Sequence, residues 1–244
     1  MCGRYVSARS PQDLAVAYQA TLDPDLSLPP SWNVAPTDQV WGVLERVLED
    51  GGGTERRLRP LRWGLVPSWA KDIGIGAKLI NARAETVHEK PSFRKPFSAR
   101  RCLLPADGYY EWVPVPASTG VRAHKQPYFL TPAGGGGMAM AGLYEFWRPP
   151  GADRSDPDTM VVSCTIITTQ ATDAAGRVHD RMPLTIAPEH VDDWLDPGHH
   201  DVADLRALLE VPAGGDIAVR PVSLAVNNVR NDGPQLLDDV PDPS

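Results

Sequence analysis

The residue with the most distinctive chemistry is Cys2, which directly follows the initiator methionine. Once that methionine is removed, Cys2 carries a free α-amine beside its own thiol. The amine of such a 1,2-aminothiol attacks an aldehyde to give an imine, and the thiolate then closes a five-membered thiazolidine ring. Reference pKa values of about 7.7–8.0 for the amine and about 8.5 for the thiol lie near neutrality, and a nearby positive field would lower both. The same pair of groups suits an N-terminal nucleophile hydrolase, in which the thiol attacks and the amine serves as base.

Two further residues are candidates for proton transfer. Glu111 stands between bulky aromatic residues in the run GYYEW, and apolar surroundings raise the pKa of a carboxyl group. His179 stands in the polar run HDRMP, and an unperturbed imidazole has a pKa of about 6.5, which suits a proton shuttle. The alternatives are an outward-facing Glu111 on an alternating strand and an ordinary loop histidine.

An amide, a guanidinium and a carboxylate recur at every second position in the run NARAE. On an extended segment, Asn81, Arg83 and Glu85 therefore face the same side. Such a side could hold a polar ligand. The alternative is a surface strand with a cross-paired arginine and glutamate.

Aromatic and amide residues elsewhere in the chain are typical of a surface for unpaired nucleic acid. Trp63 and Trp69 bound the run WGLVPSW ahead of two lysines, and indoles beside cations offer stacking surfaces for bases and charges for phosphates. The alternative places both tryptophans in the core. Near the C-terminus, the run SLAVNNVRND is either a plain loop or a source of phosphate ligands, namely Asn227, Asn228 and Arg230.

The charge distribution fits a restricted contact with phosphates. The chain of 244 residues has a formal net charge of −7, which argues against a nonspecific polyanion-binding protein. Between positions 62 and 101, however, nine Lys or Arg residues stand against three acids. A local basic region on an acidic protein suits a few phosphate contacts, and the alternative is a solvated face with unevenly placed charges.

Cysteine usage and hydropathy predict a cytoplasmic protein. Three cysteines without a C-x-x-C spacing fit a reduced interior and favour neither a disulfide scaffold nor a structural zinc site. No apolar stretch approaches the roughly 18 residues that a membrane span requires, and the N-terminus lacks the apolar core of a secretion signal. We therefore expect no membrane partner.

The elements that must position these residues are mainly short strands. The run SPQD at positions 10–13 predicts a capped helix start, followed by a short helix to about position 19. Strands are predicted at 39–48, 57–63, 101–104, 109–113, 127–131, 138–144, 160–167, 184–187 and 218–224, and helices near 188–195 and 202–209. Strands that follow one another without intervening helices favour an antiparallel α+β domain over a doubly wound parallel sheet. We predict one α+β domain over residues 1–233 and an acidic, flexible tail at 234–244.

Taken together, these segments resemble the SRAP family (SOS response-associated peptidase), the abasic-site-sensing DNA–protein crosslink proteins. Seven motifs carry the resemblance in family order over almost the whole length: MCGRY, WNVAPT, LRWGLVPSW, LINARAET, RCLLPADGYYEW, VHDRMPL and VSLAVNNVRN. The resemblance implies a mostly antiparallel, barrel-like sheet with a few short helices. It also implies recognition of abasic sites in single-stranded DNA and covalent trapping of the ring-opened aldehyde. The Gly134–Gly137 tip, the Trp147–Pro157 loop and the tail match no motif of the family.

The resemblance also implies roles for individual residues. Cys2 matches the crosslinking cysteine, and Asn81 matches the asparagine that holds the amine and the sugar. Glu111 matches the glutamate that moves protons during ring opening and closure, and His179 the histidine that acts on the sugar hydroxyl and in crosslink reversal. Contacts with DNA match a larger set, which is Arg4, Arg83 and Arg181 for phosphates and Pro36, Trp63 and Trp69 for stacking near the lesion.

The implied partner is single-stranded DNA with abasic sites, bound at the nucleoid by a monomer that needs neither a metal ion nor an organic cofactor. An imine that fails to close its ring leads to strand nicking, as in an abasic-site lyase. Two alternatives stay open. Cys2, Glu111 and His179 also suit a thiol peptidase that removes Met1 from its own chain or cuts other proteins. A non-covalent single-strand binding module needs only the tryptophans and arginines.

Overall fold

Five strands close into a barrel in the computed structural model, which describes residues 2–48, 52–117, 122–211, 213 and 215–241. The ring runs through β11 (Val161–Gln170), β10 (Met138–Trp147), β7 (Arg101–Ala106), β4 (Gln39–Val47) and β5 (Thr54–Trp63). It closes because β5 and β11 pair in parallel, with Arg62 opposite Ser163 and Trp63 opposite Cys164. Three short strands pair with the ring, namely β2 (Thr21–Leu22) beside β5, and β6 (Asn81–Arg83) and β12 (Arg181–Pro183) beside β11.

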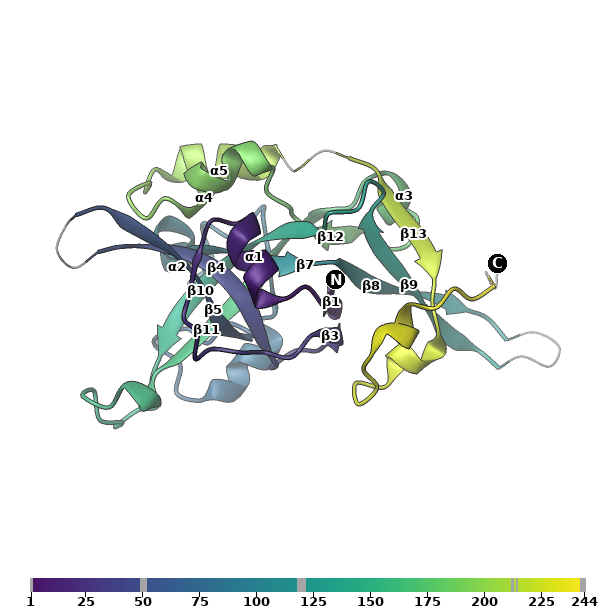
Figure 1. Cartoon of the computed structure of the whole chain (residues 1–244), viewed down its shortest axis with the longest axis horizontal. Helices are drawn as coiled ribbons and strands as arrows, with labels where there is room; N and C mark the ends of the chain where they lie inside the picture. Colours follow the sequence, from purple (N-terminus) through teal and green to yellow (C-terminus); the bar gives the residue numbers. More distant parts are fainter. Residues whose placement is uncertain (1, 49–51, 118–121, 212, 214, 242–244) are drawn as a thin grey trace.

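A second sheet carries the start of the chain. Its strands, in order, are β13 (Ile217–Pro221), β9 (His124–Pro132), β8 (Gly108–Val115), β1 (Tyr5–Ser7) and β3 (Ser31–Val34), and neighbours are antiparallel. The β4–β5 and β8–β9 hairpins extend toward opposite ends of the molecule (Figure 1). Because Tyr5 of β1 pairs with Tyr109 of β8, the first residues of the chain lie next to the strand that bears Glu111.

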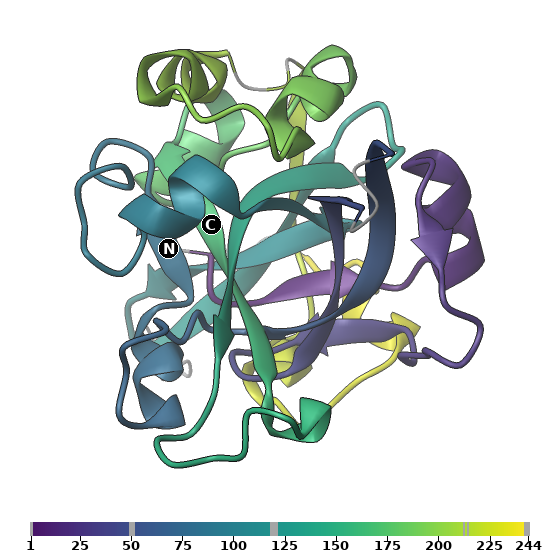
Figure 2. The same cartoon turned by 90° about the vertical axis from the view of Figure 1, so that its left-hand side faces the viewer.

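The helices are short and lie outside the strands. α1 (Pro11–Ala17) begins as predicted, because the Ser10 hydroxyl accepts a hydrogen bond from the Asp13 amide and Pro11 stands in the first turn. The remaining helical segments are α2 (Arg94–Ala99), α3 (Asp173–Gly176), α4 (Val191–Leu195) and α5 (Val202–Glu210), and the 3₁₀ turns η1 (Ile73–Lys78), η2 (Pro157–Thr159), η3 (Pro188–His190), η4 (Leu224–Asn227) and η5 (Pro234–Leu237). Figure 2 shows α4 and α5 along one side of the strands and α1 along another. No helix in the described ranges combines the length and apolar character needed to cross a bilayer.

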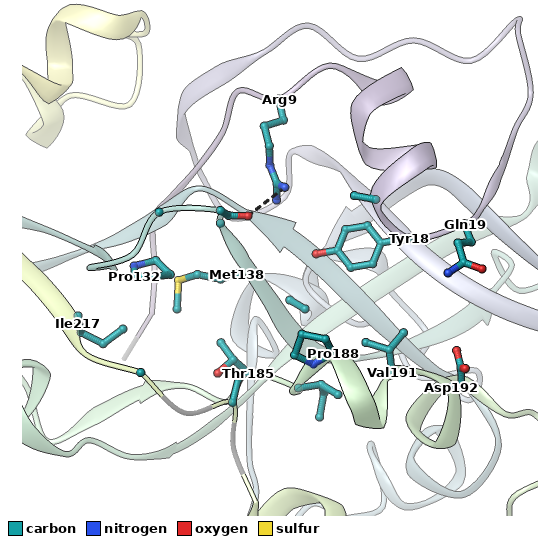
Figure 3. Close-up of a pocket in the computed structure, with 18 of the residues that line it drawn as sticks. Arg9, Tyr18, Gln19, Pro132, Met138, Thr185, Pro188, Val191, Asp192 and Ile217 are labelled. Atoms are coloured by element: carbon teal, nitrogen blue, oxygen red, sulfur yellow. Dashed lines mark hydrogen bonds between the residues drawn. The ribbon is translucent and has the colours of Figure 1, made fainter.

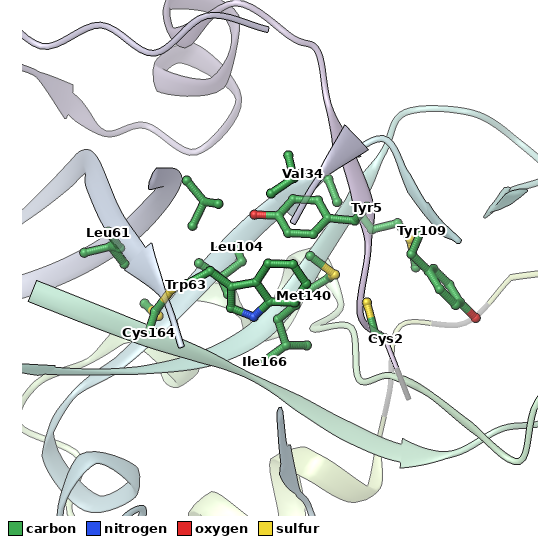
Figure 4. Packing of buried hydrophobic residues seen from close by; sticks show 14 of the residues in the cluster. Cys2, Tyr5, Val34, Leu61, Trp63, Leu104, Tyr109, Met140, Cys164 and Ile166 are labelled. Carbon is green, nitrogen blue, oxygen red and sulfur yellow. The ribbon is translucent and has the colours of Figure 1, made fainter. Parts of the chain in front are cut away.

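Aromatic and aliphatic side chains fill the space between the barrel and the second sheet. Trp63 and Tyr5 are fully buried and lie edge to face, with ring centroids 5.2 Å apart. The Trp63 Nε1 group donates a hydrogen bond to the Ile80 carbonyl at 3.0 Å. Figure 4 shows Cys2 at one end of this cluster, beside Tyr109. Truncation of a buried tryptophan costs about 3–5 kcal/mol of folding stability. Cys2 therefore packs against a stable part of the core.

The single α+β domain with mostly antiparallel strands is confirmed. The predicted strand at 184–187 is wrong in detail: β12 ends at Pro183, and Thr185 makes only an isolated bridge with Met140. The chain pairs there with the edge of β10 for too short a distance to form a strand.

The C-terminal segment packs against the second sheet, in contrast to the flexible tail that its charge indicated. Leu236 of η5 is 2% exposed and contacts the cluster that contains Tyr110 and Phe129. Arg220 donates hydrogen bonds to the Leu237 carbonyl at 2.6 Å and to Asp239 at 2.8 Å. Leu236 and Arg220 thus hold in place a segment whose acidic composition predicted flexibility. Residues 242–244 lie outside the described residues.

Candidate active site

Residue 2 is held by an amide from a neighbouring strand. The Asn81 Nδ2 group donates a hydrogen bond to the Cys2 carbonyl oxygen at 2.8 Å. Asn81 begins β6 and lies opposite Ile166 of β11, so the barrel sets its position. The Asn81 Oδ1 atom is buried and has no hydrogen-bond partner within the described part of the chain. Because a buried acceptor without a partner is costly, this oxygen is suited to receive a hydrogen bond from an amine or hydroxyl of a bound ligand.

The Cys2 thiol is buried against apolar side chains. It has no exposed surface and belongs to the cluster of Tyr5 and Tyr109. Burial raises the pKa of this thiol well above its ordinary value, and the negative charge of Glu111 raises it further. The shift is opposite to the lowering that a positive field would produce, because the loss of hydration outweighs the nearby charges. The thiol is therefore protonated near neutral pH and needs a base before it can act as a nucleophile.

Glu111 approaches the same place from β8. Its side chain is 4% exposed, so the outward-facing alternative is wrong. Burial raises the pKa of the Glu111 carboxyl group, as its aromatic neighbours predicted, and the charge of His179 opposes part of the rise. A carboxyl group with a raised pKa exchanges protons closer to neutral pH, which suits a general acid and base.

His179 completes the group from the loop between α3 and β12. Its Nδ1 atom accepts a hydrogen bond from the Arg181 amide at 2.9 Å and lies 2.8 Å from the Asp180 Oδ1 atom. Glu111 and His179 line one pocket of about 540 Å³, together with Arg4, Trp112, Lys125 and Asn227. Of the four residues expected to carry the chemistry, Glu111 and His179 share this pocket, while Cys2 bonds to Asn81 and feels the charge of Glu111. They come from four separate segments of the chain.

Trp112 and Lys125 are pocket residues that the sequence did not single out. The Trp112 indole donates a hydrogen bond to the Asn227 Oδ1 atom at 2.6 Å, and the Arg4 guanidinium lies over its ring at 5.7 Å from the centroid. These contacts fix Trp112 as a wall of the pocket. Its position next to Glu111 in the GYYEW run was a usable signal. The sequence around Lys125 held no such signal, because the position of Lys125 follows from the pairing of β8 with β9, where it lies opposite Pro114.

Arg4, an expected phosphate contact, holds the N-terminal segment of the chain to β3 and η4. Its guanidinium donates to the Asn33 Oδ1 atom at 2.8 Å and to the Val226 carbonyl at 3.1 Å. Burial lowers the pKa of Arg4 from its ordinary value. Arg4 therefore joins β1 to β3 and η4 while it lines the pocket.

The other two expected arginines lie in different surroundings. Arg181 forms a two-pronged ion pair with Glu85 and donates to the Thr168 carbonyl. Hydrogen bonds from Arg181 hold the pKa of the Glu85 carboxyl below its usual range. Arg83 is exposed on β6, which ends there, so Glu85 lies in the following turn and pairs with Arg181 instead of with Arg83.

The two tryptophans of the WGLVPSW run have opposite environments. Trp63 is fully buried in the core, which corrects its expected role as a stacking surface, since no face of the indole is open to a base. Trp69 is 59% exposed in the loop that follows β5. Pro36 is half-buried in the turn between β3 and β4, where the Thr37 amide donates to the Trp63 carbonyl at 2.8 Å.

The expected C-terminal ligands are only partly brought to the pocket. Asn227 lines it, whereas Asn228 and Arg230 are exposed beyond η4, with the Asn228 side chain accepting a hydrogen bond from the Arg230 amide at 3.1 Å. In the ranges that the structure describes, no group of three or more His, Cys, Asp or Glu side chains is placed to hold a metal ion.

A second pocket of about 530 Å³ lies between α1, the Gly134–Gly137 turn and the start of α4 (Figure 3). Arg9 reaches into it and donates a hydrogen bond to the Gly136 carbonyl at 3.3 Å. Gly135, Gly136 and Gly137 all have positive φ, which explains the run of glycines. Its described lining includes none of Cys2, Asn81, Glu111 and His179.

Comparisons with known proteins show what the chain is similar to. The family model described as SOS response associated peptidase (SRAP) matches residues 1–229. The abasic site processing protein YoqW of Bacillus subtilis is 38% identical over 241 residues, which cover 98% of this chain and 99% of that protein. The abasic site processing protein HMCES of mouse is 32% identical over 280 residues, which cover 97% of this chain and 75% of that protein.

Solved structures share the fold. A protein from Bacteroides thetaiotaomicron superposes with a TM-score of 0.77 at 22% identity, covering 98% of this chain and 100% of that one. A phage-related protein from Bordetella bronchiseptica superposes with a TM-score of 0.66 at 27% identity, covering 91% of this chain and 94% of that one.

Proposed function

Because the chain belongs to the SOS response associated peptidase (SRAP) family, we propose that it processes abasic sites in single-stranded DNA by a covalent link through Cys2. The links of Cys2 to Asn81 by a hydrogen bond and to Glu111 by the effect of its charge on the thiol pKa, with Glu111 and His179 lining one pocket, carry the proposal. The names of its relatives support the choice of lesion. The ring-opened form of an abasic site has an aldehyde at C1′, which is the group that a 1,2-aminothiol captures.

The first step forms an imine after Met1 has been removed. The neutral amine of Cys2 adds to the C1′ carbon, and one of its protons passes to the aldehyde oxygen. Protonated Glu111 then gives a proton to the resulting hydroxyl group, which leaves as water, and the imine nitrogen stays protonated. Asn81 orients the partners, because its Nδ2 group holds the Cys2 carbonyl and its Oδ1 atom accepts from the amine or the sugar.

The second step closes the ring. Glu111, now a carboxylate, takes the proton of the Cys2 thiol, and sulfur bonds to the C1′ carbon of the protonated imine as its carbon–nitrogen double bond becomes a single bond. The product is a thiazolidine, and each crosslink releases one water molecule. Since a thiazolidine is far less prone to β-elimination than an open imine, ring closure separates capping of the lesion from strand cleavage. His179 acts on the sugar hydroxyl and in the reverse reaction.

Contacts with DNA hold the lesion over this pocket. In the proposal, Arg4, Arg83 and Arg181 bind phosphates, as do the three C-terminal residues Asn227, Asn228 and Arg230. Trp69 and Pro36 contact bases beside the lesion, and the exposure of Trp69 supports that role.

A denaturing gel tests the proposal. Protein whose first residue is Cys2 is incubated with a single-stranded oligonucleotide that contains one abasic site, and in parallel with the undamaged oligonucleotide. We expect a band of the combined mass with the abasic strand alone, because only a covalent link survives denaturation. Retention of the undamaged strand in a native gel, without a denaturation-resistant band on the abasic strand, would favour the non-covalent binding module.

Two variants separate the roles of the amine and the thiol. Cys2→Ser keeps the amine, so we expect no stable crosslink but continued imine-dependent nicking of the strand. A glycine placed before Cys2 converts the amine into an amide, so we expect neither product. A full yield of stable crosslink from Cys2→Ser would contradict the proposal.

A second proposed activity is the self-removal of Met1, because the Cys2 thiol and the Glu111 carboxyl interact closely enough to shift the thiol pKa. The test is the intact mass of the parent and of Glu111→Ala, both made where methionine aminopeptidase is absent. Loss of Met1 from the parent and its retention in the variant are expected for self-processing. Retention in both would assign the cleavage to another enzyme.

A further inference from the structure

Asn33 is a buried side-chain amide that joins two distant parts of the chain. It lies in β3 and is 4% exposed. Its Oδ1 atom accepts a hydrogen bond from the Arg4 Nη1 group at 2.8 Å. Its Nδ2 group donates to the carbonyl oxygens of Asn231 at 2.7 Å, Asn228 at 3.1 Å and Val226 at 3.4 Å. One side chain therefore ties the start of the chain to a segment that begins 193 positions after Asn33.

The segment that Asn33 binds, residues 226–231, has little regular structure of its own. η4 ends at Asn227, and Asn228 and Arg230 beyond it are exposed. In the described part of the chain no strand pairs with this segment, so its inward-facing carbonyl groups need other donors. The Asn33 amide supplies them. Its loss removes a donor from three carbonyl groups at once, and the segment then loses its fixed position.

Arg4 is held by neutral groups. Its Nη1 group donates to Asn33 and to the Val226 carbonyl at 3.1 Å, and no carboxylate of the described residues forms an ion pair with it. The Arg4 Nε atom is buried and has no hydrogen-bond partner in the same part of the chain. Because an amide fixes the guanidinium group without cancelling its charge, Arg4 keeps a full positive charge and an unpaired edge for an anion. An aspartate at position 33 would neutralise that charge.

The same contacts place Asn227 in the pocket. Asn227 lies between Val226 and Asn228, whose carbonyl groups Asn33 binds. It lines the pocket of about 540 Å³ together with Arg4. A shift of this segment would therefore move Asn227 and break the contact of Arg4 with Val226 at the same time.

We infer that Asn33 is a positioning residue for the bound strand, because it holds Arg4 and residues 226–231 in one arrangement in which their phosphate contacts form together. Among the described residues, none of the hydrogen bonds of the Asn33 side chain reaches Cys2 or Glu111. Asn33 thus acts on the binding of DNA and not on the reacting atoms. The inference rests on the proposed function, which assigns phosphate contacts to Arg4 and to residues of this segment.

A double-mutant cycle tests the inference. Affinity for an undamaged single strand is measured by fluorescence anisotropy for the parent, Arg4→Ala, Asn33→Ala and the double variant. Loss of one charged phosphate contact should weaken binding about tenfold, so we expect that factor from Arg4→Ala and at least as much from Asn33→Ala. Because Asn33 acts through Arg4, the double variant should lose little more than Asn33→Ala alone. Independent effects would multiply to about 100-fold or more.

Asn33→Asp tests the argument about charge. The variant keeps the shape of the side chain and an acceptor for Arg4, but its negative charge pairs with the guanidinium group. Affinity should fall, and the slope of log affinity against log salt should become shallower by about 0.7, the contribution of one phosphate on a single strand. A slope equal to that of the parent would contradict the inference. Asn33→Asp also takes the place of Asn33→Ala in the cycle if the alanine variant does not fold.

Crosslinking to the abasic strand separates positioning from chemistry. In Asn33→Ala, the DNA concentration for half-maximal crosslinking rate should rise about tenfold, while the rate at saturating DNA stays near that of the parent. The matched control is Thr131→Val, which removes a hydrogen bond of 2.7 Å to the Asp107 carbonyl in the same sheet. Thr131 lies roughly 20 Å along β9 from Lys125 of the pocket. The control should lower the melting temperature without changing either crosslinking constant.

Three outcomes would overturn the inference. The first is an Asn33→Ala variant that behaves like Thr131→Val, with lower stability and unchanged affinity. The second is a cycle in which the losses multiply, and the third is a lower rate at saturating DNA with an unchanged half-saturation concentration. Should the parent form no crosslink at all, the proposed covalent function fails, and the cycle on undamaged strands still decides the role of Asn33.

Discussion

At the level of single residues, the pKa values of Cys2 and Glu111 shift in the same direction. Burial raises the pKa of both groups, so both favour their protonated, uncharged forms. A buried charge without a partner is expensive, and a pair that passes one proton between its members avoids holding two negative charges in a small space. This arrangement explains how a thiol with an unfavourable pKa can still serve as a nucleophile, because its base lies next to it.

The first prediction concerns stability and Glu111→Gln. Because burial raises the folded-state pKa of Glu111 above the unfolded value of about 4.3, its contribution to stability is present at low pH and is lost as pH rises through the folded-state pKa. Glutamine imitates the protonated form and has no such loss. We expect the variant to match the parent at pH values below about 4 and to have the higher melting temperature near neutral pH. Thermal unfolding across this pH range measures the difference, and a variant that is less stable at neutral pH would contradict the assignment.

The second prediction concerns Asn81→Ala. Loss of the hydrogen bond to the Cys2 carbonyl frees the terminus, and misplacement by about 1 Å can cost about 100-fold in rate. We expect the crosslinking rate at saturating DNA to fall by about that factor, while non-covalent affinity for the strand is kept. Gln39→Ala, which removes an exposed amide from β4, is the matched control. Equal crosslinking rates for Asn81→Ala and Gln39→Ala would contradict a role for Asn81 in the reaction.

At the level of elements, the sequence predicted the long strands well and the short ones poorly. β4, β5, β10 and β11 have nine or ten residues each and stand out, whereas β1, β6 and β12 have three residues each and exist only through their partners. The site depends on those short strands. The sequence motifs therefore identified Asn81 and Glu111. They predicted neither the burial of the Cys2 thiol nor the place of Lys125 in the pocket.

The burial of Trp63 has the same origin. The WGLVPSW run does not show which of its two tryptophans is buried and which is exposed. In the structure, parallel pairing of β5 with β11 places the first in the core, and the turn at Pro67 leaves the second exposed. Pairing between strands far apart in the chain decides which indole a base can meet.

The ion pair between β12 and the turn after β6 leads to a third prediction, at Glu85→Gln. Arg181 is held by Glu85 and would have to leave it to bind a phosphate. Partly exposed ion pairs contribute about 0.2–1 kcal/mol, so we expect the variant to bind undamaged single strands up to about fivefold more tightly. Glu89→Gln removes the same charge from an exposed acid and controls for net charge. If both variants bind equally, the pair does not restrain Arg181.

At the level of the whole molecule, an acidic protein presents a local basic surface. The chain as a whole has a net charge of −7, while Lys78 of η1, Arg83 of β6 and Arg94 and Lys95 of α2 are exposed; Arg101 of the same stretch is buried. One chain supplies the thiol, amide, carboxyl and imidazole groups, so we propose that it acts as a monomer. Affinity should fall as salt rises, with a slope set by the number of phosphates that are neutralised.

The most direct measurement is the mass of the crosslinked peptide. The crosslink formed with an abasic strand is digested with protease and nuclease, and the modified peptide is sequenced by mass spectrometry. We predict a peptide that begins at Cys2, lacks Met1 and carries the sugar remnant with the loss of one water molecule. A remnant on Cys102, Cys164 or a lysine, or a crosslinked peptide that still begins with Met1, would contradict the account.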